Sequence, residues 1–564
     1  MVLLVIFLTI TTLILASFFM GSSLYLKKEL TLTKTAISPP HSIIKNACSR
    51  THYPSLCFTT LTSVPISKSS ITFHHFLETA INQTVKSVAT TRLNITTNLF
   101  ALQDLNLQEK NALEDCMEML DQTLYELGQA IEDLHHFPAS MVAYPEGSFG
   151  NLKTLLSAAM TNENTCIDGI YEMQEADLDS QNFLKEHLQE LLTPISRMIS
   201  NCLAMIKFME TINRDKTPHV HQQTPITKNP KKGFLSWMTT NDRNLIHKEP
   251  NVKPDIIVAS DGSRDYRVIE EAVKMAPNNS MNRFVIKIKA GVYNESVVIP
   301  REKTNIMFLG DGMNSTLITG TKNLADGFST FNSATLTIVG DKFLARDLTI
   351  SNTAGPKKFQ AVAARVTSNA AFYRCNFSSY QDTLYAHSLR QFYHECIIQG
   401  TIDFIFGNAA AVFQNCVILV HKPNPTQKNM ITAQARGDPN QNTGISLQNC
   451  TIMASTDLNA TDRHNFSTFL GRPWRNYSRT MVMRSYLGDL IHPQGWCKWN
   501  QYSNLNTVEY IEYLNCGPGS DTRHRVTWPG YRKNCSEDVA KQFTVDAFLH
   551  EADNWLGSTG WLMR

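Results

Sequence analysis

A short pattern centred on cysteine recurs in the second half of the chain and constrains its fold more than any other feature. The cysteines lie at 375, 396, 416 and 450, so the first three are 21 and 20 residues apart. Apolar residues stand three positions before each cysteine and two positions after it (Phe372, Tyr393, Phe413, Leu447; Phe377, Ile398, Ile418, Ile452). A self-similar period near twenty residues, rich in β-forming side chains, is typical of a solenoid of stacked coils. Because no long amphipathic helix interrupts residues 280–455, we predict a right-handed parallel β-helix over residues 254–564.

Two aspartates share one place in this repeat. Asp382 follows Cys375 by seven residues, and Asp403 follows Cys396 by the same interval. On successive coils they would lie about 4.8 Å apart, the spacing of neighbouring strands. Two carboxylates that close cannot both ionise cheaply, so we expect one to hold a proton while the other stays charged. Asp457 also lies seven residues after a cysteine, so the spacing alone does not identify a site.

The neighbours of the two aspartates strengthen the hypothesis. Asp403 lies in the apolar run 402–407, where desolvation raises a carboxyl pKa unless a cation compensates. Gln381 precedes Asp382, and Gln360 opens the run 360–365; two converging amides are suited to hold an oxyanion. The run 471–474 supplies a cation and an aromatic face. Its Arg472 is suited to keep a carboxylate ionised, and its Trp474 to stack on a sugar ring.

Other catalytic patterns are missing from the sequence. No Gly-x-Ser-x-Gly elbow or Gly-x-Gly-x-x-Gly turn is present, and the paired histidines at 74–75 and 135–136 face apart on expected helices. The net charge of +2 argues against bulk nucleic-acid binding. Of the catalytic patterns considered, the pair Asp382 and Asp403 is therefore the remaining candidate.

The first half has helical rather than β periodicity. Apolar residues three and four positions apart form stripes, which predict an all-α bundle over residues 40–207 (Leu113, Cys116, Leu120, Leu124, Leu127, Ile131, Leu134; Leu184, Leu188, Leu191, Ile195, Ile199, Cys202, Ile206). No paired acids or metal-spaced histidines lie on these stripes. Residues 208–253, with four prolines and an excess of basic residues, read as a linker.

The N-terminus predicts entry into the secretory route. Residues 1–26 carry no charged side chain and are followed by Lys27 and Lys28, which is typical of a signal peptide or a membrane anchor. Eleven Asn-x-Ser/Thr sequons and twelve cysteines favour an oxidising, extracellular destination. We therefore expect export with cleavage, with a retained anchor as the alternative.

Five blocks of the second half resemble plant pectin methylesterases and occur in that family's order (291–295, 360–365, 381–384, 403–407 and 470–474). The likeness runs from about residue 254 to 561. The first half resembles the four-helix pectin methylesterase inhibitor fold through Cys48, Cys57, Cys116 and Cys166. The whole chain is similar to a pro-form with an inhibitor-like, autoinhibitory N-terminal region.

This resemblance implies a role for each candidate residue. Asp403 is expected to attack the methyl ester of a galacturonate unit in homogalacturonan, and Asp382 to act as the acid and base. Gln360 and Gln381 would stabilise the transition state. The substrate contacts implied are with Thr330, Gln360, Phe406, Arg472 and Trp474. No metal or organic cofactor is implied.

The resemblance also implies disulfides, a location and partners. The pairs implied are Cys48–Cys57, Cys116–Cys166 and Cys396–Cys416, although the spacing itself leaves open which of the stacked cysteines pair. The location is the plant cell wall, and the partners are methyl-esterified pectin and inhibitor domains, whether intramolecular or separate.

Some positions depart from the family pattern. Arg264 and Ala435 stand where glycine is usual, and the coil between Gln360 and Gln381 is one residue short. The usual dibasic processing run is degraded to Arg-Asn-Leu-Ile at 243–246, which puts release of the helical half in doubt. Two rival functions stay open: a polygalacturonase or lyase, and an inhibitor that acts through the helical half.

Overall fold

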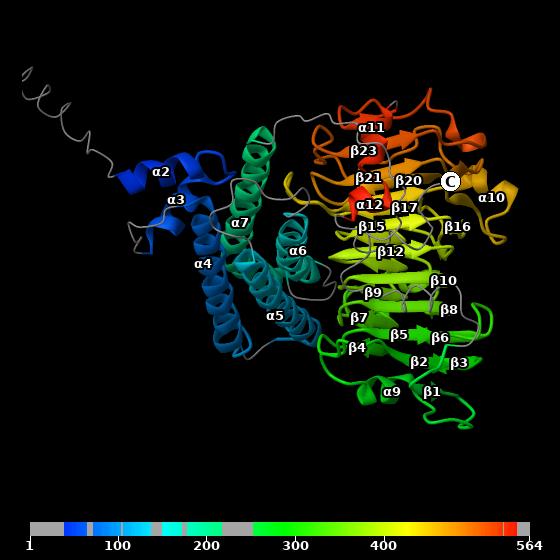
Figure 1. Cartoon of the computed structure of the whole chain (residues 1–564). Coiled ribbons are helices and arrows are strands. Elements are labelled where there is room, and N and C mark those ends of the chain that lie inside the picture. The colour runs from blue at the N-terminus through cyan, green and yellow to red at the C-terminus, as the bar shows by residue number, and fades with distance from the viewer. Residues whose placement is uncertain are drawn as a thin grey trace, which may run out of the picture.

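The structure, a computed structural model, describes residues 39–64, 72–102, 105–136, 149–171, 178–216, 252–533 and 535–549. Helices occupy the chain up to residue 216, and a stack of parallel strands follows from residue 256. The helical half lies beside the stack, with α5 and α6 nearest to it (Figure 1). The expected fold class, a helical region followed by a parallel β-helix, is confirmed. The N-terminal segment 1–26 and the processing run 243–246 lie outside the described residues.

The helical half consists mainly of long helices that pack side by side. Their bounds are α2 Pro39–Cys48, α3 Pro54–Thr62, α4 Phe73–Asn94 with the π-helical turn η1 Ile95–Leu99, α5 Leu107–His135, α6 Gly150–Tyr171 and α7 Leu178–Lys216. Asn106 and Glu109 form a capping box that fixes where α5 begins. Helix α7 continues to residue 216, beyond the expected end of the bundle at residue 207.

The apolar stripes of the sequence form the core of this half. Leu113, Leu120, Leu127 and Leu134 of α5 are fully buried, as are Leu188 and Ile199 of α7. Disulfides join Cys48 to Cys57 and Cys116 to Cys166, as expected. Cys202 is buried as an unpaired core residue, and burial raises its pKa to about 12.

The β-helix is built from two parallel sheets that run the length of the stack. The larger sheet contains β1 Ile256–Val258, β2 Phe284–Ile288, β3 Gly291–Asn294, β5 Ile306–Leu309, β6 Thr316–Gly320, β8 Phe343–Asn352, β10 Ala370–Ser378, β12 Arg390–His394, β13 Ile397–Gly400, β15 Ala410–Gln414, β16 Val417–Val420, β18 Gly444–Gln448, β19 Thr451–Ala454, β21 Arg479–Met483, β22 Tyr486–Leu487, β23 Glu509–Tyr513 and β24 Tyr531–Arg532.

The smaller sheet contains β4 Val297–Ile299, β7 Leu336–Ile338, β9 Ala364–Val366, β11 Leu384–Ala386, β14 Ile405–Gly407, β17 Asn429–Gln434 and β20 Thr468–Pro473. Short helical elements lie at an end of the stack, in its loops or, for α12, against β15 of the larger sheet (α9 Ile269–Met275, η2 Leu324–Asp326, η3 Pro356–Lys358, α10 Ala460–Asn465, η4 Pro518–Ser520, α11 Glu537–Lys541, α12 Val545–Phe548).

The cysteine-centred repeat corresponds to one coil of this stack. Phe372, Tyr393 and Phe413 lie in register on β10, β12 and β15. Their rings stack with centroids 5.0 and 4.5 Å apart, so the repeat forms a continuous aromatic column in the core. Strands β15 and β16 are separated at Asn415, whose left-handed conformation (φ 55°) bends the coil.

The expected disulfide Cys396–Cys416 is wrong. Cys375, Cys396, Cys416 and Cys450 are all free and buried, one on each successive coil. Neighbours in a parallel ladder hold their Cβ atoms about 4.8 Å apart along parallel directions, which is wider than the 3.5–4.5 Å that a disulfide needs. Each thiol instead donates to backbone carbonyls; the Cys416 Sγ lies 3.4 Å from the oxygen of Tyr393.

Candidate active site

Asp382 and Asp403 occupy the same place on successive coils of the smaller sheet. Each precedes its strand by two residues, and β11 pairs with β14 so that Leu384 lies opposite Ile405. Both aspartates adopt left-handed backbone conformations, with φ of 63° and 51°. This conformation is rare for residues other than glycine, and Asp is among those that tolerate it best. Other turns of the stack, including that at Asn415, adopt it as well, so the conformation follows from the geometry of the coil.

Arg472 forms an ion pair with Asp403. Its Nε and Nη2 donate to both carboxylate oxygens of Asp403 at 2.9, 3.2 and 2.5 Å. Arg472 comes from β20, two strands beyond β14 in the sheet. A two-pronged contact of this kind fixes the orientation of the carboxylate as well as its charge.

Burial and the ion pair act on Asp403 in opposite directions. Desolvation raises the pKa of Asp403, and the charge of Arg472 and its hydrogen bonds lower it; the net direction is upward. The sequence predicted both influences.

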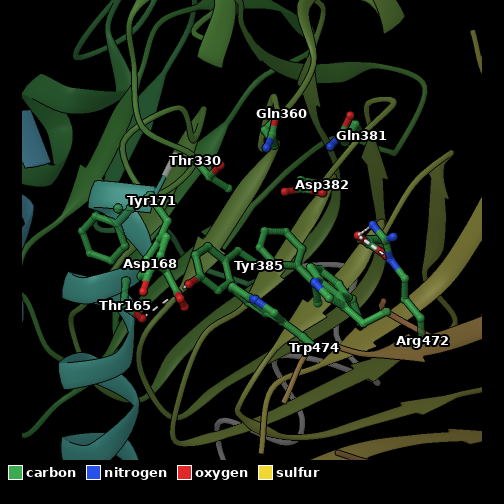
Figure 2. Close-up of a pocket in the computed structure, with 16 residues that line it drawn as sticks. Thr165, Asp168, Tyr171, Thr330, Gln360, Gln381, Asp382, Tyr385, Arg472 and Trp474 are labelled. Carbon is green, nitrogen blue, oxygen red and sulfur yellow. Dashed lines mark hydrogen bonds and ion pairs between the residues drawn. The ribbon is translucent and has the colours of Figure 1, made fainter. Parts of the chain in front are cut away.

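One cavity of about 320 Å³ brings the predicted residues together. It is lined by both aspartates and by Thr330, Gln360, Gln381, Phe406, Arg472 and Trp474. Gln360 and Gln381 pair across neighbouring coils, so their side chains emerge side by side above Asp382 (Figure 2). The structure thus brings every catalytic and substrate-binding candidate to one cavity.

The aromatic lining includes residues that the sequence reasoning missed. Tyr385 stacks on Phe406 with ring centroids 4.2 Å apart. Trp499 stacks on Trp474 at 6.2 Å and lies 4.1 Å from the guanidinium of Arg472. The repeat could have identified Tyr385, because it follows Asp382 by three residues as Phe406 follows Asp403. No such signal marks Trp499, which reaches the cavity from a loop.

Helix α6 of the helical half closes one side of this cavity. Thr165, Asp168, Gly169 and Tyr171 contribute to its lining (Figure 2). Asp168 forms an ion pair with Arg475 at 2.5 Å. Burial raises the pKa of Asp168, and Arg475 opposes that shift.

The same helix reaches His387 at the end of β11. The hydroxyl of Thr165 lies 2.9 Å from Nε2 of His387. Burial, together with the charge of Arg365, lowers the pKa of His387 to about 3. The imidazole is therefore neutral while the helix covers it.

Helix α5 lies along the rest of the same face. Asp115 accepts hydrogen bonds from Ser329 and Asn332, and Glu118 pairs with Arg365 at 3.1 Å. Together α5 and α6 place three carboxylates, those of Asp115, Glu118 and Asp168, against the outer face of the smaller sheet.

Comparison with known proteins assigns this β-helix to a family. Residues 255–553 match the family model described as Pectinesterase, and residues 42–205 match the one described as Plant invertase/pectin methylesterase inhibitor. "Pectinesterase 3" of Citrus sinensis is 44% identical, covering 93% of this chain and 88% of that protein. "Pectinesterase/pectinesterase inhibitor U1" of Solanum lycopersicum is also 44% identical, with 93% and 89% covered. The chain belongs to the pectinesterase family of ester hydrolases and carries an inhibitor domain before the enzyme domain.

A solved structure matches the enzyme half alone. "Pectin methylesterase from Carrot" is 52% identical, with a TM-score of 0.54, and covers 56% of this chain and 99% of its own. The buried clusters of the β-helix interior draw their residues from 252 onward only. The enzyme half therefore has its own core, and its likeness covers 99% of the chain in the carrot structure.

Within the part of the chain that the structure describes, no helix combines the length and apolar character needed to span a bilayer.

Proposed function

We propose that this chain hydrolyses the methyl esters of homogalacturonan, the main acidic polymer of pectin, to free carboxylates and methanol. The observation that carries the proposal is the Asp403–Arg472 pair, in a cavity shared with Asp382, Gln360 and Gln381. It combines an oriented anion, a second carboxyl group and two amide donors, which ester cleavage through an acyl-enzyme requires.

In the first half of the reaction, an oxygen of Asp403 attacks the ester carbonyl carbon. The carbonyl oxygen gains negative charge and accepts hydrogen bonds from the side-chain amides of Gln360 and Gln381. As the tetrahedral intermediate collapses, the bond to the methoxy oxygen breaks, and Asp382 gives that oxygen its proton. Methanol leaves, and the galacturonate carbonyl remains bound to Asp403 as an anhydride.

In the second half, water replaces methanol. Asp382, now ionised, takes a proton from water as the water oxygen attacks the anhydride carbonyl. The bond to Asp403 breaks, which frees the galacturonic acid group and restores both aspartates to their starting states; the new carboxyl group then releases its proton to solvent. Throughout both halves, Arg472 keeps Asp403 oriented and balances its charge.

The test is methanol release from highly methylated homogalacturonan by residues 252–564. We expect Asp403→Asn to lower kcat by roughly a thousandfold, the scale for loss of a covalent nucleophile. Asp457→Asn is the matched control. Asp457 shares the seven-residue spacing from a cysteine but pairs with His421, whose ring nitrogen is 3.1 Å away, and it is not among the residues that line the cavity. Equal rates for wild type and Asp403→Asn would remove Asp403 from the mechanism.

The polygalacturonase and lyase hypotheses predict a different product. Both cleave the sugar chain, so the viscosity of a pectin solution would fall as the reaction proceeds. Ester hydrolysis releases methanol and acid while the polymer keeps its length. Measuring viscosity and methanol in the same sample separates the three activities.

We also propose that the helical half inhibits the enzyme half in the same chain. Support comes from α6, whose Thr165, Asp168 and Tyr171 occupy one wall of the cavity. A polymer cannot follow the cleft while α5 and α6 cover it. The remaining hypothesis, an inhibitor of other esterases, predicts that residues 45–206 alone inhibit a separate enzyme and that this function survives in an Asp403→Ala variant.

We infer that the protein works in the plant cell wall after export. The sequon asparagines at 82, 278, 294, 314, 449, 459, 465 and 476 are exposed, so glycan transfer would not disturb the core. Peptide mapping of the secreted protein tests this inference through the glycans and the position of the mature N-terminus.

A further inference from the structure

Arg365 belongs to a row of residues on the outward face of the smaller sheet. It has no role in the proposed ester hydrolysis. The register places it between Thr337 on β7 and Tyr385 on β11. The same row continues through Phe406 and ends at Arg472. Arg365 is thus two strand spacings from Phe406, about 9 to 10 Å along the floor of the cleft.

The side chain of Arg365 is buried and uses only part of its hydrogen-bonding capacity. It is 2% exposed, and neither Nε nor Nη1 has a hydrogen-bond partner. Its guanidinium lies 3.4 Å from the ring centroid of Phe331, and one nitrogen contacts the half-exposed Glu118 of α5. Leaving donors of a buried cation unpaired is costly, and an apolar side chain would pack against Phe331 without that cost. In the full chain the helical half covers this part of the smaller sheet; we call this the covered state. Its contacts do not explain why an arginine stands at position 365.

A free carboxylate matches the unused donors. Arginine presents its N–H groups as a planar fork that fits the two oxygens of a carboxylate, and Phe331 holds that plane in place. In the covered state Glu118 supplies a carboxylate at this point, although through one contact only. Phe331, which the guanidinium contacts, lines the cavity, and removal of the helical half would take Glu118 away from Arg365.

We propose that Arg365 binds the free carboxylate of a galacturonate unit near the reacting ester and so makes the enzyme prefer partly de-esterified polymer. Glu118 occupies this carboxylate subsite in the covered chain. The proposal rests on the proposed function, because it needs homogalacturonan in the cleft. It adds a residue that determines which ester along the polymer is chosen.

The test compares two substrates for residues 252–564. One is fully methyl-esterified homogalacturonan, and the other is the same polymer with about half of its esters removed. For Arg365→Met we expect KM on the partly de-esterified polymer to rise roughly ten- to a hundredfold, with kcat little changed. KM on the fully esterified polymer should stay within about twofold. Arg365→Lys should restore part of the loss, since lysine keeps the charge without the fork.

A second measurement separates binding from catalysis. In an Asp403→Asn background, calorimetry should detect trigalacturonate binding that weakens at least tenfold on Arg365→Met. Arg532→Gln is the charge control, because Arg532 lies on β24 of the other sheet and is half-exposed. Thermal unfolding of each variant establishes that it is folded.

The outcomes are distinguishable. If Arg365→Met raised KM equally on both polymers, or left KM on the partly de-esterified polymer unchanged, the proposed carboxylate subsite would be overturned. Trigalacturonate binding that is insensitive to Arg365→Met would overturn it as well. Absence of methanol from either polymer with the wild-type enzyme half would instead overturn the proposed function.

Discussion

Arg472 donates to both carboxylate oxygens of Asp403, although 69 residues separate the two along the chain. The contact joins β20 to the turn before β14, so it crosses two coils of the stack. It orients one aspartate of the pair and leaves Asp382 to a different set of contacts. The two carboxyl groups are thereby made chemically unequal, which an acid and a nucleophile require.

Loss of this contact should change the pH dependence of the enzyme half. Arg472 lowers the pKa of Asp403 against the opposing effect of burial. In Arg472→Met the pKa of Asp403 therefore rises further. Attack needs the ionised form, so the acidic limb of kcat/KM should move to higher pH, and kcat should fall roughly a hundredfold. A pH profile of methanol release checks this, and an unmoved acidic limb would contradict it.

Loss of the Asp168–Arg475 pair should weaken inhibition by the helical half. In Asp168→Asn the charge that faces Arg475 is removed, and docking should weaken by roughly 1 to 3 kcal/mol. Methanol release by the full chain should therefore rise. Asp121→Asn is the control, because Asp121 pairs with Arg92 inside the helical half. If both variants released methanol at the wild-type rate, the ion pair would have no part in docking.

The helical half should lose stability as the pH rises. Burial raises the pKa of Glu163 to about 8 and also raises that of Glu126, which accepts a hydrogen bond from Asn162. A raised pKa favours folding fully below the unfolded value, near 4.5, and this contribution disappears as the pH passes about 8. The free energy of unfolding should fall by roughly a few kcal/mol between pH 5 and 8.

Urea unfolding of the full chain at several pH values measures this effect. Glu163→Gln should flatten the dependence, while Glu190→Gln on the exposed surface of α7 should leave it intact. A stability that rises with pH in the wild-type helical half would reverse the sign and refute the argument.

The four cysteines stacked on successive coils, which we call the cysteine ladder, should remain reduced in the folded protein. Alkylation after denaturation without reductant should label Cys375, Cys396, Cys416 and Cys450, because these four thiols are free. Cys48, Cys57, Cys116 and Cys166 should stay unlabelled, since they form disulfides. Mass spectrometry of the peptides gives the answer directly, and a linked pair of peptides carrying Cys396 and Cys416 would contradict the ladder.

Much of the site could be predicted because it follows the period of the repeat. A shift of 21 residues carries Asp382 onto Asp403 and Tyr385 onto Phe406, so local spacing translates directly into neighbouring positions. The same reasoning failed for Cys396 and Cys416. Equal positions on adjacent coils imply proximity, but not the inclined Cβ directions that a disulfide needs.

The contacts between the two halves could not be predicted in this way. Asp168 meets Arg475 across 307 residues, and Glu118 meets Arg365 across 247. No period relates these positions, because they depend on how one folded body docks on another. Trp499 was missed for a similar reason: a loop rather than a strand carries it to Arg472.

The sequence by itself determined the two architectures and the row of catalytic candidates. Apolar spacing of three and four residues produces helices, and a period near twenty produces stacked coils. The tertiary structure alone decided that α5 and α6 cover the cleft and that Arg365 is buried with unused donors. Those features arise from packing between surfaces far apart in the chain, which local periodicity does not encode.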